Sequence, residues 1–114
     1  MMSCFASLAR LLCVALLLLG LSAPSKAWAA DGAQLFEMHC AGCHVNGGNI
    51  IRRGKTLKMA ALQRQGVDSA EAIAVIAAQG QGQMSGYGEV LGAEGVEAVA
   101  AWVWQQSQAD WPKS

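Results

Sequence analysis

The residues best suited to chemistry form one short run, Cys40-Ala41-Gly42-Cys43-His44, which follows His39. This run and His39 contain both His residues of the chain and two of its four Cys. Two thiols separated by two residues and followed directly by an imidazole suit three kinds of site. They could bind zinc, cycle between dithiol and disulfide, or form thioethers with a haem whose iron is bound by His44.

The surroundings of the motif favour the haem among these three. A closed zinc site needs four ligands, and the fourth candidate, His39, lies directly beside Cys40, which suits a tetrahedron poorly. A redox-active CxxC normally begins a helix after a strand, whereas this one ends a predicted helix in a chain without strand patterns. In a c-type haem site, Cys40 and Cys43 reach adjacent edges of one porphyrin, and His44 turns under the iron.

A second axial ligand is expected from the glycine-rich loop around Met84. Met38 is next to the motif and cannot reach the other haem face, while Met59 lies in a short predicted helix. His39 is the weaker competitor, because it neighbours an anchor on the proximal side. Without Met84 on the iron, the protein would be a haem-based ligand-binding or peroxidase-like protein. The lack of a His or Arg near Met84 argues against peroxidase chemistry.

Four helical patterns position these residues, and no stretch alternates with the period of a strand. Capping residues predict where three of them begin, namely Asp31, Thr56 and Ser69. We therefore expect an all-α domain. The predicted helices cover residues 31 to the CxxCH motif, 57–65, 70–79 and 93–108, with loops at 45–54 and 80–92. Because the helices are rich in Ala, a haem is expected to fill much of the core.

The first thirty residues resemble an export signal. Arg10 precedes the apolar run of residues 11–21, and Ala27-Trp28-Ala29 offers a small-x-small cleavage site. We expect residues 1–29 to be a cleavable signal peptide and residues 30–114 to be a single domain. An uncleaved anchor is the alternative, and the large Leu12 before Cys13 argues against a lipoprotein. Formal net charge is zero and basic residues form no stripe, so nucleic acid is not an expected partner.

Beyond the motif, most of the chain after residue 30 resembles the cytochrome c6 family, small photosynthetic class I c-type cytochromes. The resemblance rests on seven stretches that occur in the family's order. They are Gly32-Ala33-Gln34-Leu35-Phe36, the CxxCH motif, Gly47-Gly48-Asn49, Lys55-Thr56-Leu57, Ser69-Ala70-Glu71-Ala72-Ile73, Gly80-x-Gly82-x-Met84, and Val99-Ala100-Ala101-Trp102-Val103 with Trp111 beyond it.

This resemblance implies a class I cytochrome c fold, with about four helices around one covalently bound haem c. It implies a monomeric one-electron carrier, not an enzyme, that takes electrons from cytochrome f of the b6f complex and passes them to photosystem I. Its compartment would be the thylakoid lumen or the periplasm, where a terminal oxidase is an alternative acceptor. By family position, Asn49 and Lys55 are candidates for contacts with the haem propionates or for ordering the loop.

Four positions depart from the family pattern. Ser85 follows Met84 where the family has Pro, so the ligand loop loses a fixed φ angle. Arg53 also replaces a Pro, and the orientation of His44 then needs another constraint. Ile76 replaces a Gln near the haem, which predicts a lower reduction potential than that of the main photosynthetic donor. Val90 replaces an Arg carried by many cyanobacterial members, which weakens the case for their usual docking to photosystem I.

Overall fold

Residues 27–113 fold into four α-helices and one short 3-10 helix in the computed structural model, which describes residues 7, 9–14 and 27–113. The helices are α2 (Ala27–His39), η1 (Val45–Gly47), α3 (Met59–Arg64), α4 (Ala70–Gln79) and α5 (Gly88–Gln108). The described residues contain no strand, only an isolated bridge between Gln81 and Met84. The prediction of an all-α class is confirmed.

Most of the expected signal peptide, residues 1–29, lies outside the described residues, so its removal stays a prediction. None of the helices in the described part of the chain is long and apolar enough to cross a membrane.

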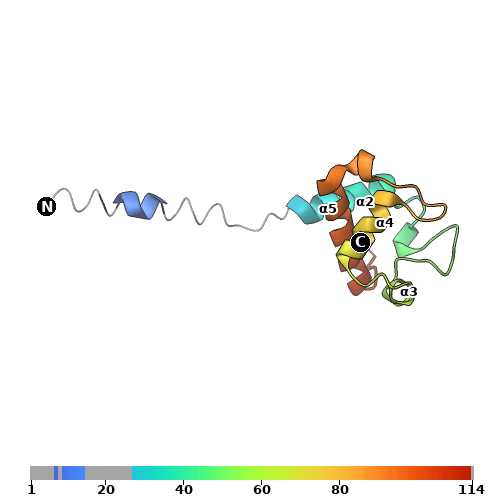
Figure 1. Cartoon of the computed structure of the whole chain (residues 1–114). Coiled ribbons are helices and arrows are strands. Elements are labelled where there is room, and N and C mark those ends of the chain that lie inside the picture. Colours follow the sequence, from blue (N-terminus) through green and yellow to red (C-terminus); the bar gives the residue numbers. More distant parts are fainter. Residues whose placement is uncertain (1–6, 8, 15–26, 114) are drawn as a thin grey trace.

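Helix α5 is the centre of the fold and packs against both α2 and α4 (Figure 1). The crossing with α2 is close at Gly32, because a Cβ atom there would overlap the Ala98 carbonyl oxygen and lie 2.8 Å from Cβ of Trp102. Trp102 packs on Phe36 of α2, with ring centroids 4.8 Å apart. Trp102 of α5 thus contacts α2 at both Gly32 and Phe36.

Two predicted helix starts are wrong. Helix α2 begins at Ala27, so Asp31 lies inside it and is not its N-cap; the alanines before Asp31 favour extension of the helix. The second helix begins at Met59, not Leu57, with Lys58 as its N-cap. The Leu57 amide donates to the Gly47 carbonyl at 2.7 Å, and that bond holds Leu57 in the preceding loop.

The other two helices follow the sequence patterns more closely. Ser69 caps α4 by accepting a hydrogen bond from the Ala72 amide at 3.1 Å, and Gly80 ends it with φ of 78°. Helix α5 begins at Gly88, earlier than the predicted Ala93. Its first turn is separated from the rest by a kink at Gly92, where φ is 68°, so regular helix does resume near the predicted residue.

Candidate functional site

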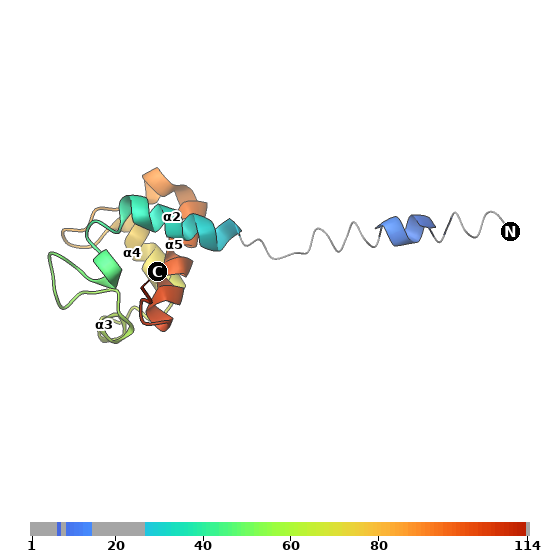
Figure 2. The ribbon, with the colours of Figure 1, turned by 180° about the vertical axis from the view of Figure 1, so that it is seen from behind.

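A cavity of about 350 Å³ opens between the loop that follows His44 and the loop that carries Met84. Figures 1 and 2 show the two loops on the same side of the domain, away from the end at which α2 begins. The walls of the cavity are formed mainly by apolar side chains from α2, α3, α4 and α5. They include Phe36, Leu62, Ile73, Ile76, Val99 and Val103, and Val67 joins them from the connection between α3 and α4. The volume falls in the range of about 300–1,000 Å³ that is typical of small-molecule and cofactor sites.

The CxxCH motif reaches this cavity from the C-terminal end of α2. The amides of Cys43 and His44 both donate to the Cys40 carbonyl, at 3.2 and 3.0 Å, and this tight turn brings all three side chains to the cavity wall. No disulfide joins the two sulfurs. Burial, and to a smaller extent the charge of Cys43, raises the pKa of the Cys40 thiol. The turn thus presents two thiols and an imidazole to the same space.

Only one nitrogen of His44 is free to bind a metal. Its Nδ1 atom lies 2.8 Å from the Gly48 carbonyl oxygen. Because a carbonyl can only accept, Nδ1 carries the proton and donates, which leaves the Nε2 lone pair as the ligand. A hydrogen bond of this kind also fixes the ring orientation and raises the basicity of the ligand nitrogen.

The C-terminal end of α5 supports the loop that follows His44. The Leu57 carbonyl accepts from Ser107 Oγ at 2.7 Å and from Trp111 Nε1 at 3.0 Å. The Trp111 ring packs directly on Gly47, where a Cβ atom would overlap it. Since Gly47 also accepts from the Leu57 amide, Ser107 and Trp111 hold the segment next to Gly48. The support therefore reaches the segment whose Gly48 carbonyl accepts from His44.

Asn49 organises the rest of the same loop. Its Oδ1 atom accepts from the amides of Ile51 and Arg52, at 2.9 and 2.7 Å, and its Nδ2 atom donates to the Lys55 carbonyl at 2.9 Å. The Lys55 amide in turn donates to the Arg52 carbonyl at 3.0 Å. Asn49 and Lys55 both line the cavity, and the geometry assigns Asn49 to ordering the loop.

Met84 lines the cavity from a loop that glycine holds closed. The amide and carbonyl of Gln81 pair with those of Met84, each at 3.0 Å. Gly80 approaches this turn so closely that a Cβ atom would overlap the Met84 carbonyl oxygen. At Gly86 a Cβ atom would lie 2.6 Å from the Ala78 carbonyl oxygen. Close backbone packing therefore holds this turn, although Ser85 cannot fix φ as Pro would.

The remaining predicted residues divide between the cavity and the surface. Ile76 is half-buried and lines the cavity, as does His39, whose ring lies 6.1 Å from that of Tyr87. Arg53 and Val90 are exposed and do not line it.

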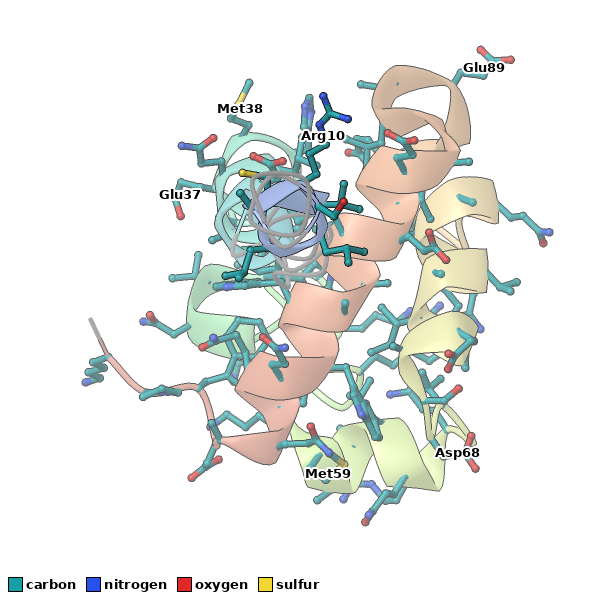
Figure 3. The ribbon with its side chains drawn as sticks, turned by 90° about the vertical axis from the view of Figure 1, so that its left-hand side faces the viewer. Arg10, Glu37, Met38, Met59, Asp68 and Glu89 are labelled. Atoms are coloured by element: carbon teal, nitrogen blue, oxygen red, sulfur yellow. The ribbon has the colours of Figure 1, made fainter. Side chains whose placement is uncertain are left out.

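The two competing methionines are absent from the cavity wall. Met38 is 74% exposed and points away from the domain in Figure 3, which also places Met59 on α3. Met84 is therefore the methionine that faces the CxxCH motif across the cavity.

Sequence reasoning missed the support given by Ser107 and Trp111. Their partner Leu57 is 50 and 54 positions away along the chain, so no local pattern could indicate the contact.

The residues of the cavity fit a haem. Its walls are apolar, one side carries two thiols and an imidazole with a free Nε2, and a thioether sulfur lines the same space. Such a donor set is that of a c-type haem with His and Met axial ligands. In the described part of the chain, no group of three or more His, Cys, Asp or Glu side chains is arranged to hold a metal ion.

Comparisons with known proteins agree with this site. The family described as "Cytochrome C oxidase, cbb3-type, subunit III" matches residues 27–103. A cytochrome c6-like protein of Nostoc sp. strain PCC 7120 is 47% identical over 81 residues, which are 71% of this chain and 73% of that protein. Cytochrome c6 of Aphanizomenon flos-aquae is 46% identical over 83 residues, or 73% of this chain and 95% of that one.

Among solved structures, that of cytochrome c6B from Synechococcus sp. WH8102 has 58% sequence identity and a TM-score of 0.73. The match covers 80% of this chain and 100% of the other. The likeness includes the sequence and the fold together.

Proposed function

Because the chain belongs to the cytochrome c6 family of electron carriers, we propose that it is a mobile one-electron carrier between cytochrome f of the b6f complex and photosystem I, or a related acceptor. It has the class I cytochrome c fold and one covalently bound haem c. The observation that supports the proposal is that the CxxCH motif and Met84 line the same mainly apolar cavity. We further propose that residues 1–29 direct export to the thylakoid lumen or periplasm and are removed.

Each site residue has a defined part in this proposal. Cys40 and Cys43 would hold the haem through thioethers, and His44 Nε2 and the Met84 sulfur would bind its iron. When bound, the haem supplies a one-electron Fe(III)/Fe(II) couple. With both of these side chains on the iron, no position would remain for a substrate, as expected of an electron carrier.

The protein contributes to the potential through the wall of the cavity. A thioether ligand raises a haem potential, and polar groups near the iron adjust it. Ile76 presents an aliphatic side chain where the family pattern has a Gln, so we propose a potential below that of the main photosynthetic donor. Asn49 and Lys55 border the same cavity and would contribute through the haem propionates or through the loop.

The test is to measure electron transfer with both partners. Stopped-flow mixing with reduced soluble cytochrome f should reduce the haem protein, and flash excitation of photosystem I particles should oxidise it. Failure of both reactions, with normal redox cycling by small reagents, would contradict the proposed partners. In that event a terminal oxidase preparation is the next acceptor to assay.

A second candidate function is ligand binding at an open iron. The observation that favours it is Ser85, which leaves the Met84 loop without the Pro of the family. Carbon monoxide binding by the reduced wild-type protein would distinguish the two, because a stable Met84 ligand blocks it.

A further inference from the structure

A second hollow, separate from the haem cavity, lies between α2 and α5. It has a volume of about 400 Å³ and is lined by one face of each helix. On both helices the lining residues follow the i, i+3, i+4 and i+7 spacing of a single helix face. They are Asp31, Gln34, Leu35 and Met38 of α2, and Leu91, Glu94, Gly95 and Ala98 of α5. We call this surface the α2/α5 groove.

The groove and the haem cavity use different faces of the same two helices. They share no lining residue. Leu35 and Ala98 line the groove, whereas the next residues along each helix, Phe36 and Val99, line the haem cavity. Successive residues of an α-helix point in directions about 100° apart. A molecule in the groove would therefore contact α2 and α5 without covering the side chains that face the haem.

Gly95 keeps the groove open at its centre. A Cβ atom there would lie 3.1 Å from Cβ of Leu91 and 3.5 Å from Cδ1 of Leu35, so a side chain at this position would enter the space beside the two leucines. Both leucines are half-buried, and Met38 at one end of the groove is 74% exposed. Figure 3 shows Met38 pointing away from the domain. The described part of the chain thus leaves an apolar floor uncovered.

The charges along the groove are negative. Asp31 and Glu94 line it, one from each helix, and no Lys or Arg is among its described lining residues. Neither α2 nor α5 contains a Lys or Arg, while Glu37, Glu89 and Glu97 add further carboxylates to these helices. An apolar floor with carboxylates on both sides is complementary to an apolar surface flanked by cations, and it disfavours an anionic one.

From these observations we propose that the α2/α5 groove binds a basic amphipathic helix of a partner protein. The apolar stripe of that helix packs on Leu35, Leu91 and Met38. Its Lys or Arg side chains lie beside Asp31 and Glu94. Recognition of a helix in an apolar groove is a recurring mode of peptide binding, and charge complementarity sets its specificity. The inference goes beyond the proposed function and does not rest on it, because the groove shares no residue with the haem cavity.

The experiment titrates the haem-loaded, reduced protein with a synthetic peptide of about 18 residues, long enough to form a helix in isolation. This peptide has Leu on one face and Lys on the other, and a second peptide has Glu in place of every Lys. Correlation spectra of ¹H and ¹⁵N follow the amides of the protein. We expect the Lys peptide to shift the amides of Leu35, Met38, Leu91 and Gly95 most, and to leave the loop around Met84 unchanged. The Glu peptide should shift none of them.

Variants test the two parts of the groove. Asp31→Asn with Glu94→Gln removes both lining carboxylates and should weaken binding of the Lys peptide by roughly threefold to tenfold. The matched control, Glu37→Gln with Glu97→Gln, removes the same charge from the same helices outside the groove wall and should weaken binding by less than about twofold. Met38→Gln keeps the length of an exposed side chain but not its apolar contact, and should weaken binding by roughly twofold to fivefold.

Four results would overturn the inference. Equal weakening by the two double variants, or equal binding of the Lys and Glu peptides, would show that the groove does not recognise the peptide. Shifts confined to the loops around the haem cavity would place the peptide elsewhere. Concentration-dependent shifts at the groove without peptide would identify a second copy of this chain as its occupant. Binding of octylammonium as tight as that of the peptide would identify a small organic cation. All of these readings need only the folded haem protein, so they are independent of the outcome for the proposed electron-transfer partners.

Discussion

The two loops that face each other across the cavity are held by different means. The loop after His44 is fixed by side-chain as well as backbone bonds, and two of the side-chain bonds come from Ser107 and Trp111, 50 and 54 positions away from Leu57 along the chain. The loop that carries Met84 is closed by backbone bonds and by the close approach of Gly80 and Gly86. Support for His44 is therefore part of the tertiary fold, whereas support for Met84 is local.

The two loops should therefore respond differently when a contact is removed. Loss of a bond on the His44 side should lower the free energy of unfolding of the whole domain, because the bond joins α5 to the loop. Disruption of the Met84 loop should release an iron ligand while α2 and α5 stay packed. The predictions below separate the two sides.

The largest effect is expected from Gly86→Ala. The new Cβ atom would lie 2.6 Å from the Ala78 carbonyl oxygen and 2.8 Å from the Gln79 carbonyl carbon. Overpacking of this kind costs about 1–3 kcal/mol, and moving the loop away relieves it. We expect loss of the Met84 ligand, seen as carbon monoxide binding by the reduced variant and a lower midpoint potential. Gly54→Ala is the control, since a Cβ atom there meets nothing within 4 Å; similar spectra for both variants would contradict the prediction.

A smaller and global effect is expected from Ser107→Ala. Ser107 is 2% exposed, and its hydroxyl oxygen lies 2.7 Å from the Leu57 carbonyl oxygen and 2.8 Å from that of Val103. Removing it should lower the free energy of unfolding by about 1–2 kcal/mol. Denaturant titration of the haem protein measures the free energy of unfolding. The reduced variant should still not bind carbon monoxide. Carbon monoxide binding with unchanged stability would reverse the assignment of the two sides.

Substitutions of Asn49 distinguish the two hydrogen bonds that its side chain accepts from the one that it donates. Asn49→Ala removes all three bonds and should cost about 1–3 kcal/mol of unfolding free energy, whereas Asn49→Asp keeps the two acceptor bonds and should cost less. Thermal melts of the two variants measure the difference. Equal melting temperatures for Ala and Asp variants would show that the bonds to Ile51 and Arg52 do not order the loop.

The smallest structural change is expected from Ile76→Gln, which should alter the midpoint potential of the haem and leave both loops in place. The residue lines the cavity from α4, so the amide would add a polar donor to an apolar wall without touching either loop backbone. We expect the midpoint potential to rise by tens of millivolts, where about 59 mV is a tenfold change in a one-electron equilibrium. Ile76→Val is the control for altered packing. An unchanged potential in the Gln variant would remove Ile76 as a tuning position.

The sequence predicted the parts of this molecule that depend on local chemistry. The extent of α4 followed from Ser69 and Gly80, and the motif at Cys40 indicated the cofactor of the family. The predicted start of α3 at Leu57 was wrong because Leu57 is held by Gly47, Ser107 and Trp111. No local sequence pattern contains these contacts. The role of Gly86 was also missed, because its close approach to Ala78 exists only once α4 and the loop have folded together.

The central claim is that His44 and Met84 are both iron ligands in a carrier of lowered potential. A redox titration of the purified haem protein, with its visible spectrum recorded at each potential and again under carbon monoxide, tests it most directly. We expect a low-spin c-type spectrum in both oxidation states, no carbon monoxide adduct, and a midpoint potential clearly below that of the main photosynthetic donor. A carbon monoxide adduct of the reduced protein would contradict Met84 ligation, and a midpoint equal to that of the photosynthetic donor would contradict the assignment of Ile76.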